Sequence, residues 1–149
     1  MGSKRAVLQE FKNFYMIERN FYPIFKEINK TYGVFELKLA KNGKPLPFKA
    51  LDKDQIQSLL DVSGNDGLYH KIPDGFNRFG GNSVSQKPFD CFQLKNVSAF
   101  VVAIYYMPRK YKNFFYISIK DWLKEKEISK RKSLTSQRAE EISKIKINL

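Results

Sequence analysis

The chain has 149 residues, of which 42% are hydrophobic and 15% aromatic, so it can bury one domain-sized core and is not disordered overall. Lys and Arg number 27 against 15 Asp and Glu, and the resulting net charge of +12 favours a polyanionic partner such as nucleic acid. The single cysteine, Cys91, excludes a disulfide framework, and the single histidine, His70, excludes a multi-histidine metal site. Any metal would need oxygen ligands, which points to Mg²⁺ or Mn²⁺.

The cellular compartment is predicted from two sequence features that the chain does not have. No apolar run approaches the roughly 18 residues that span a bilayer, and the N-terminus has no signal-peptide core. Together with the lone cysteine, this predicts an intracellular protein that does not bind membranes, located in the cytoplasm or wherever its DNA lies. A viral or phage gene would fit the same expectation.

The first predicted element is a helix. Residues from about Arg5 to Asn29 carry apolar side chains at a helical period. Pro23 interrupts the pattern, so it either kinks this helix or opens a second one at its first turn. Gly33 is a stop signal, Val34 to Ala40 is expected to form a strand, and Asn42-Gly43 is typical of a turn.

A further helix is predicted to begin after Asp52. This aspartate can accept hydrogen bonds from the free amides of the first turn, while Gln55 can reach back to the amide of the N-cap, as in a capping box. An apolar face follows at Ile56, Leu59 and Leu60. Gly64 is expected to end the helix.

The second half of the chain is rich in predicted strands. Leu68 to Ile72 and Lys87 to Leu94 have strand character and are separated by a Gly-rich loop. Ala99 to Tyr106 is continuously apolar, which predicts a strand covered on both faces. Phe114 to Ile119 is expected to be another strand, followed by a helical turn from Asp121.

The order of these elements predicts an α/β or α+β fold with a mixed central sheet flanked by helices. Residues 1–128 are expected to form one domain. Residues 129–149 are expected to form a basic C-terminal tail, with an amphipathic helix from Ser133 to Lys144.

Charged residues interrupt the strand that begins at Val34. Since side chains alternate along a strand, Glu36 and Lys38 share one face, and Phe35, Leu37 and Leu39 share the other. If the charged face is partly covered, both groups must pair, bind a metal or line a functional cleft.

Several segments together resemble the PD-(D/E)XK nuclease superfamily, and within it most closely the Holliday-junction resolvases. They are Phe35-Glu36-Leu37-Lys38, the helix start Asp54-Gln55-Ile56, the strand end Lys71-Ile72, and Phe115-Tyr116-Ile117 followed by Trp122. The resemblance spans about Val34 to Leu123 and implies a restriction-endonuclease-like core. It also implies a divalent metal held by Glu36 and an aspartate, a water positioned by Lys38, and Gln55 near the scissile phosphate.

The implied aspartate does not precede Glu36, as it does in the usual motif order, because residues 5–35 contain none. The later candidates are Asp74, which follows Pro73, and Asp90, which lies between Phe89 and Cys91-Phe92. Asp90 is preferred, since a charge among aromatic residues is costly whereas Asp74-Gly75 is ordinary turn chemistry. A hairpin from Pro88 to Tyr106 would then be the aspartate hairpin of the superfamily in a rearranged order.

The resulting hypothesis is an Mg²⁺- or Mn²⁺-dependent endonuclease acting on DNA, with branched DNA such as Holliday junctions as its substrate class. Cutting two symmetric strands would call for a two-fold homodimer. The candidate contacts to the phosphate backbone are basic: Lys71, Lys87, Arg109, Lys110, Lys112, Lys130, Arg131 and Lys132.

Two alternatives belong to other functional classes. The chain could be a non-catalytic nucleic-acid-binding module whose exposed aromatic residues stack on bases, with Tyr105, Tyr106, Tyr111 and Phe115 as candidates. It could also be a basic structural protein that binds a partner through residues from Ser129 onward. In both cases Glu36 and Lys38 would form an ordinary ion pair on a strand, and Gln55 would be only a helix cap.

Overall fold

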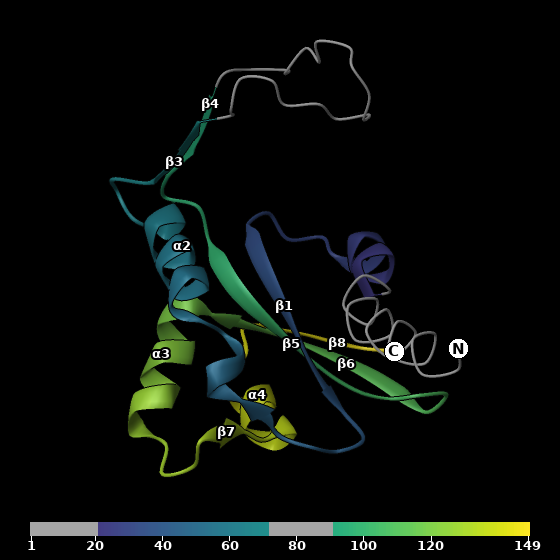
Figure 1. The fold of residues 1–149 in the computed structure, drawn as a ribbon. Coiled ribbons are helices and arrows are strands. Elements are labelled where there is room, and N and C mark those ends of the chain that lie inside the picture. Colours follow the sequence, from purple (N-terminus) through teal and green to yellow (C-terminus); the bar gives the residue numbers. More distant parts are fainter. Residues whose placement is uncertain (1–20, 72–90) are drawn as a thin grey trace, which may run out of the picture.

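A computed structural model describes residues 21–71 and 91–149 of the chain. Its centre is a four-stranded mixed sheet in the order β1-β5-β6-β8, built from β1 (Val34–Lys41), β5 (Ala99–Met107), β6 (Tyr111–Ser118) and β8 (Ile145–Asn148). β1 is parallel to β5, and the other neighbouring pairs are antiparallel. Helices lie on both faces of this sheet, so the predicted α+β class with a mixed sheet is confirmed (Figure 1).

Helices α2 (Lys53–Ser63), α3 (Ile119–Ile128) and α4 (Ser136–Ile142) lie on one face of the sheet, together with the short 3-10 helix η1 (Phe48–Ala50). The helical residues 21–28, which include Pro23, pack on the other face (Figure 1). Each face buries its own apolar cluster. One is centred on Trp122 and Tyr105, and the other on Phe25 and Tyr116.

β5 is buried along almost its entire length, as its sequence predicts. Val101, Ala103 and Tyr105 point to the α2 side, while Val102 and Ile104 point to the side of residues 21–28. A strand with both faces covered has no use for polar side chains, which explains the unbroken apolar run.

The local signals around β1 and α2 are confirmed. Asn42 and Gly43 both have positive φ, of 57° and 74°, in the turn that follows β1. Asp52 is the N-cap of α2 and forms a complete capping box with Gln55, and Gly64 is the C-cap. Burial of Leu59 and Val62 then fixes α2 against the sheet.

Two short ribbons complete the described fold. β2 (Leu46–Pro47) pairs with β7 (Ser133–Leu134), and β3 (Leu68–Lys71) pairs with β4 (Cys91–Leu94). Because β4 pairs with β3, while β5 pairs with β1 and β6, the expected hairpin from Pro88 to Tyr106 is wrong as far as its described residues go. The β3-β4 ribbon instead projects away from the sheet (Figure 1).

Residues 129–149 differ from the expected helical tail. Only α4 is helical, β7 before it pairs with β2, and β8 after it is the fourth strand of the central sheet. The buried Glu125 of α3 receives two hydrogen bonds from Arg138 of α4, from Nε at 2.9 Å and from Nη2 at 3.1 Å. The apolar residues Leu134 and Ala139 are buried in the same cluster as Trp122, so this segment is part of the packed body.

In the described parts of the chain, no helix has both the length and the apolar character needed to cross a membrane.

Candidate active site

Glu36 and Lys38 lie side by side on β1, on the face that α2 covers. Phe35, Leu37 and Leu39 pack on the opposite face, as the strand alternation predicts. Lys38 Nζ lies 3.4 Å from Glu36 Oε1, and the side chain of Lys38 is only 11% exposed while that of Glu36 is 30% exposed. The lysine is therefore held inside the fold, beneath a carboxylate that solvent can reach.

Gln55 reaches this pair from α2. Its side-chain Nε2 donates a hydrogen bond of 2.8 Å to Glu36 Oε1. Its Oε1 accepts from the backbone amide of Asp52 at 3.2 Å, and its own amide donates to Asp52 Oδ1 at 2.8 Å. Because the capping box occupies the amide oxygen of Gln55, the NH₂ group is left to face Glu36.

The two oxygens of Glu36 therefore have different surroundings. Oε1 accepts from Gln55 and lies against Lys38, whereas Oε2 has no hydrogen-bond or ion-pair partner within residues 21–71 and 91–149. A carboxylate fixed through one oxygen keeps the lone pairs of the other available for a cation or a water.

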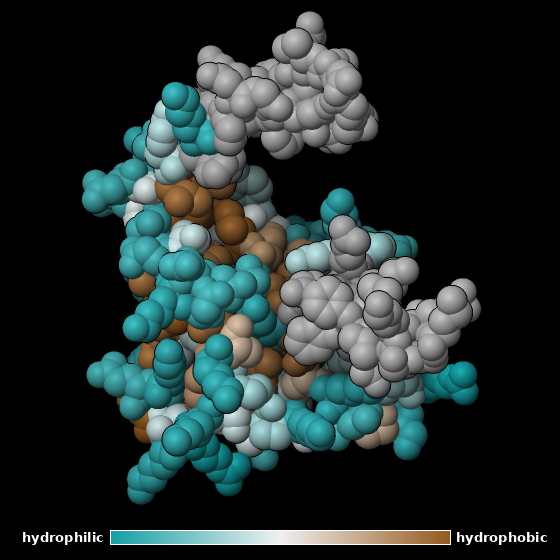
Figure 2. Space-filling model, viewed as in Figure 1, coloured by the Kyte–Doolittle hydropathy of each residue, from teal (hydrophilic) through white to brown (hydrophobic). Residues whose placement is uncertain are grey.

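Glu36 lines a cleft of about 410 Å³ between β1, α2 and the base of the β3-β4 ribbon. Asp52, Asp54, Gln55 and Ser58 of α2 and its cap form the polar part of the lining. The apolar part comes from Val34, Phe35, Leu59, Val62, Leu68 and Leu94. Apolar surface is visible in this region, below the ribbon, in Figure 2.

The described residues alone do not complete a metal site. Among them, no three His, Cys, Asp or Glu side chains come close enough together to hold a metal ion. Asp52 and Asp54 line the cleft with Glu36, but Asp52 Oδ1 is already engaged as the helix cap. Glu36 Oε2 is an oxygen of the kind that Mg²⁺ binds, and the resemblance implies an aspartate as the second ligand. Asp90 and Asp74, the two sequence candidates, lie outside the described residues.

The basic candidates are spread over the molecule. Lys71 is exposed on β3, whose residue Leu68 lines the cleft. Arg109 and Lys110 lie in the turn after β5, and Lys112 lies on β6. All three are near the C-terminal end of β5, whereas Glu36 is paired with Val101 near its beginning. Lys87 lies outside the described residues. The structure thus brings none of Arg109, Lys110 and Lys112 to Glu36.

Lys130, Arg131 and Lys132 form the loop between α3 and β7, at the opposite end of the body from the β3-β4 ribbon (Figure 1). They surround a second concave surface together with Lys49 and Lys126, which sequence reasoning missed. Lys49 and Lys126 are far apart in the chain, and no local signal places them together. Asp54 and Ser58 were also missed, although their spacing of four residues puts them on one face of α2.

The aromatic residues proposed to stack on bases are mostly unavailable for that role. Tyr105, Tyr106 and Phe115 are buried in the two apolar clusters, and only Tyr111 is partly exposed. Since the strands that carry them are covered on both faces, they do not form an open stacking surface. This result weakens the argument from these residues for a non-catalytic binding module.

Comparisons of this chain with protein-family models, with curated proteins and with solved structures find no match.

Proposed function

We propose that this protein is a metal-dependent nuclease that hydrolyses DNA phosphodiesters at the cleft beside Glu36. The observation that carries the proposal is the convergence of Glu36, Lys38 and Gln55 from two separate elements, with Glu36 Oε2 left without a partner in the described structure. An ordinary surface ion pair needs neither a buried lysine nor a glutamine fixed by a helix cap.

The cleft has the wrong charge for a phosphate unless a cation is present. Glu36, Asp52 and Asp54 all line it, so a phosphodiester would meet carboxylates there. A divalent ion removes this conflict. When bound, such an ion would lower the pKa of a coordinated water and neutralise charge that develops on the phosphate.

Each residue then has a distinct task. Glu36 would hold the ion through Oε2, with Asp90 as the second carboxylate. Lys38 would orient or help deprotonate the attacking water, and its ammonium would stabilise the negative phosphoryl oxygens of the transition state. Gln55 would keep Glu36 in place and present its amide near the scissile phosphate.

The substrate class that we propose is branched DNA, such as a four-way junction. The net charge of +12 supports a nucleic-acid partner. The segments between Phe35 and Trp122 resemble those of Holliday-junction resolvases, and this resemblance supports branched DNA as the substrate. Two symmetric incisions would require a homodimer.

The decisive test is Glu36→Gln. Purified wild-type protein with Mg²⁺ or Mn²⁺ is expected to nick or resolve labelled branched DNA. Glu36→Gln should lower the cleavage rate by at least about a thousandfold, because the substitution keeps the size of the side chain but removes the charge that holds the ion. Binding of the same DNA in Ca²⁺ or EDTA should change little.

Glu140→Gln is the matched control, because Glu140 is exposed on α4 and its substitution removes the same charge away from the cleft. Its cleavage rate should equal that of the wild type. If the wild type cuts no linear, flapped or four-way DNA and no structured RNA with either metal, the nuclease proposal fails and the binding module becomes the better account.

A further inference from the structure

A second concave surface, here named the basic pocket, lies at the end of α3. It has a volume of about 540 Å³, and its charged lining residues are all cationic: Lys49, Lys126, Lys130, Arg131 and Lys132. The rest of its lining is Pro47, Phe48, Ser129 and Ser133. Hydrophilic surface covers this lower end of the molecule in Figure 2. Five like charges around one hollow repel one another, so the arrangement favours an anion.

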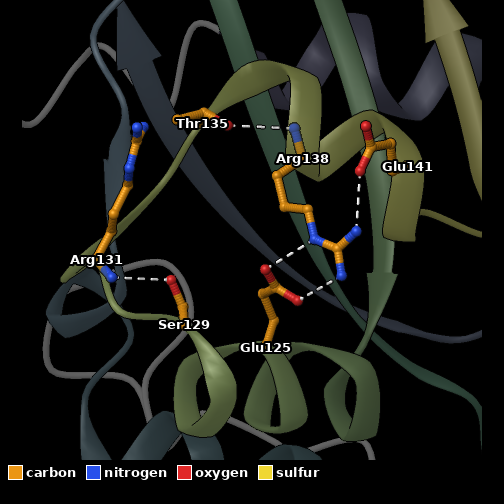
Figure 3. Close-up of polar contacts among 6 residues, drawn as sticks. All are labelled: Glu125, Ser129, Arg131, Thr135, Arg138 and Glu141. Carbon is orange, nitrogen blue, oxygen red and sulfur yellow. Dashed lines mark hydrogen bonds and ion pairs between the residues drawn. The ribbon is translucent and has the colours of Figure 1, made fainter.

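None of these five cations forms an ion pair with an acid in residues 21–71 or 91–149. The neighbouring Arg138 shows the contrast. It is bound by Glu125 and by Glu141, whose Oε2 lies 2.9 Å from Arg138 Nη1, and these carboxylates raise its pKa through hydrogen bonds. Figure 3 shows the side chain of Arg131 extending away from that cluster. Arg138 is therefore a structural residue, whereas the charge of Arg131 is unused by the fold.

The loop that carries three of the cations is held in place by hydrogen bonds of its backbone amides and carbonyls. The Phe48 amide donates to the Lys132 carbonyl at 3.1 Å, and the Arg131 amide donates to Ser129 Oγ at 3.1 Å. Pro47 is paired with Ser133 in the β2-β7 ribbon directly beside them. A loop fixed in this way needs little additional ordering when a ligand binds.

We propose that the basic pocket binds phosphate groups of a nucleic-acid backbone, at a place separate from the Glu36 cleft. The pocket contains Arg131, whose planar guanidinium suits a phosphate, and lysines that act as point charges around it. Contacts of this kind are independent of base sequence and sensitive to salt. The inference rests on the proposed function only for the identity of the polyanion.

The position of the pocket gives it a specific role. The loop between α3 and β7, which lines the basic pocket, lies at the opposite end of the body from the β3-β4 ribbon (Figure 1), and the Glu36 cleft is lined at the base of that ribbon by Leu68 and Leu94. A nucleic acid engaged in the cleft would be gripped at a second point along its backbone. Substrates too short to reach both places would lose this contribution to affinity.

The test compares two triple variants with equal loss of charge. Lys49→Ala/Arg131→Ala/Lys132→Ala removes three cations from the basic pocket, and Lys26→Ala/Lys44→Ala/Lys146→Ala removes three exposed cations from other surfaces. Binding of a labelled DNA duplex and a labelled four-way junction is measured in EDTA over a range of salt concentrations. The slope of log K against log[salt] should become shallower by about 2 to 3 in the pocket variant, since each phosphate contact contributes about 0.9. The control slope should change by less than about 1.

Lysine acetylation read by mass spectrometry locates the contact directly. Bound duplex should protect Lys49, Lys126, Lys130 and Lys132, and should leave Lys44 and Lys146 reactive. Equal slopes in the two triple variants, or no protection at the pocket, would overturn the inference. If the wild type binds DNA without cutting it, and the salt slope is still shallower in the pocket variant, the nuclease proposal is overturned. Phosphate binding at the basic pocket is then still supported. If the wild type cleaves DNA but the two triple variants have equal salt slopes, the nuclease proposal is supported and phosphate binding at the basic pocket is overturned.

Discussion

Glu36 is the central residue of the proposed site, and its two partners in the described structure act on it in different ways. Lys38 supplies charge from the same strand, and Gln55 supplies a directed hydrogen bond from a helix. The ion pair with Lys38 alone would leave the Glu36 carboxylate free to rotate. The side-chain amide of Gln55 prevents this, because its oxygen is bound to the Asp52 amide and its nitrogen to Glu36. Partners that orient a metal-ligating carboxylate commonly contribute about 10- to 100-fold to metal affinity or activity.

Gln55→Ala should therefore lower the rate of metal-dependent cleavage by about 10- to 100-fold, because Glu36 loses the donor that orients it. Gln57→Ala, on the same helix, removes only an exposed hydrogen bond to Asp61 and should leave the rate unchanged. Cleavage assays at saturating Mg²⁺, with circular dichroism as a check on folding, give the comparison. A Gln55→Ala enzyme as fast as the wild type would reduce Gln55 to a helix cap.

The sequence alone predicts the local placement of the three residues that meet at the candidate site. Alternation on a strand places Glu36 and Lys38 on one face of β1, and the capping box places Gln55 in the first turn of α2, because both are local patterns; the roles proposed for the three residues come only from the resemblance. The hydrogen bond between Gln55 and Glu36 was not predictable in the same way, since it depends on how α2 packs across β1. The unpaired oxygen of Glu36 is likewise a property of the packed structure described for residues 21–71 and 91–149.

At the scale of elements, α2 links stability to the site. Its N-cap, Asp52, starts the helix and places Gln55 in its first turn. The capping residue is exposed, so its contribution comes from satisfying a free backbone amide rather than from burial.

Asp52→Ala should destabilise the protein by about 1 kcal/mol, through loss of the side-chain cap. Urea denaturation followed by circular dichroism measures this change. Asp61→Ala is the control, because it removes an acid from the last turn of the same helix, where the helix dipole disfavours negative charge. Its stability should stay within a few tenths of a kcal/mol of the wild type. Equal losses in both variants would contradict the assignment of Asp52 as the stabilising cap.

The helices and strands differ in how strongly local sequence patterns predict them. β1, α2 and β5 carry strong local patterns, namely alternation, a capping box and an apolar run, and all three were predicted. β7 and β8 are short, and each is a strand only because it pairs with a partner from a distant part of the chain. The amphipathic pattern predicted from Ser133 to Lys144 is helical only in α4, and the pairing of β7 with β2 overrides it at Ser133 and Leu134.

For the whole molecule, two buried tyrosines tie distant segments to opposite faces of the sheet. Tyr105 Oη donates to the Leu134 carbonyl at 2.7 Å, and Tyr116 Oη donates to Asn29 Oδ1 at 3.0 Å. Burial raises the pKa of Tyr116 to about 12 and shifts the pKa of Tyr105 further in the same direction. Both hydroxyls therefore stay protonated in the folded state at pH values where the unfolded chain ionises.

These shifts predict a loss of stability at alkaline pH. Below pH 10, the ordinary pKa of tyrosine, the contribution is complete, and it is lost as the pH rises toward about 12, because the unfolded state releases its protons first. The melting temperature, followed by circular dichroism from pH 8 to pH 12, should fall above pH 10. Tyr116→Phe should show a smaller fall over that interval, and an identical profile in the variant and the wild type would count against the shift.

The parallel pairing of β1 with β5 has a consequence for how the molecule folds. Val34 is paired with Ala99, and the whole of α2 and the β3-β4 ribbon lie between them in the chain. Closing so long a loop is entropically costly, and non-local parallel pairing is slow. Because β5 follows β1 by more than the length of α2 and the β3-β4 ribbon, β1 is synthesised before the strand that it pairs with, and its edge is unpaired until then. The charges of Glu36 and Lys38 on one side of the unpaired strand discourage it from joining another sheet in the meantime.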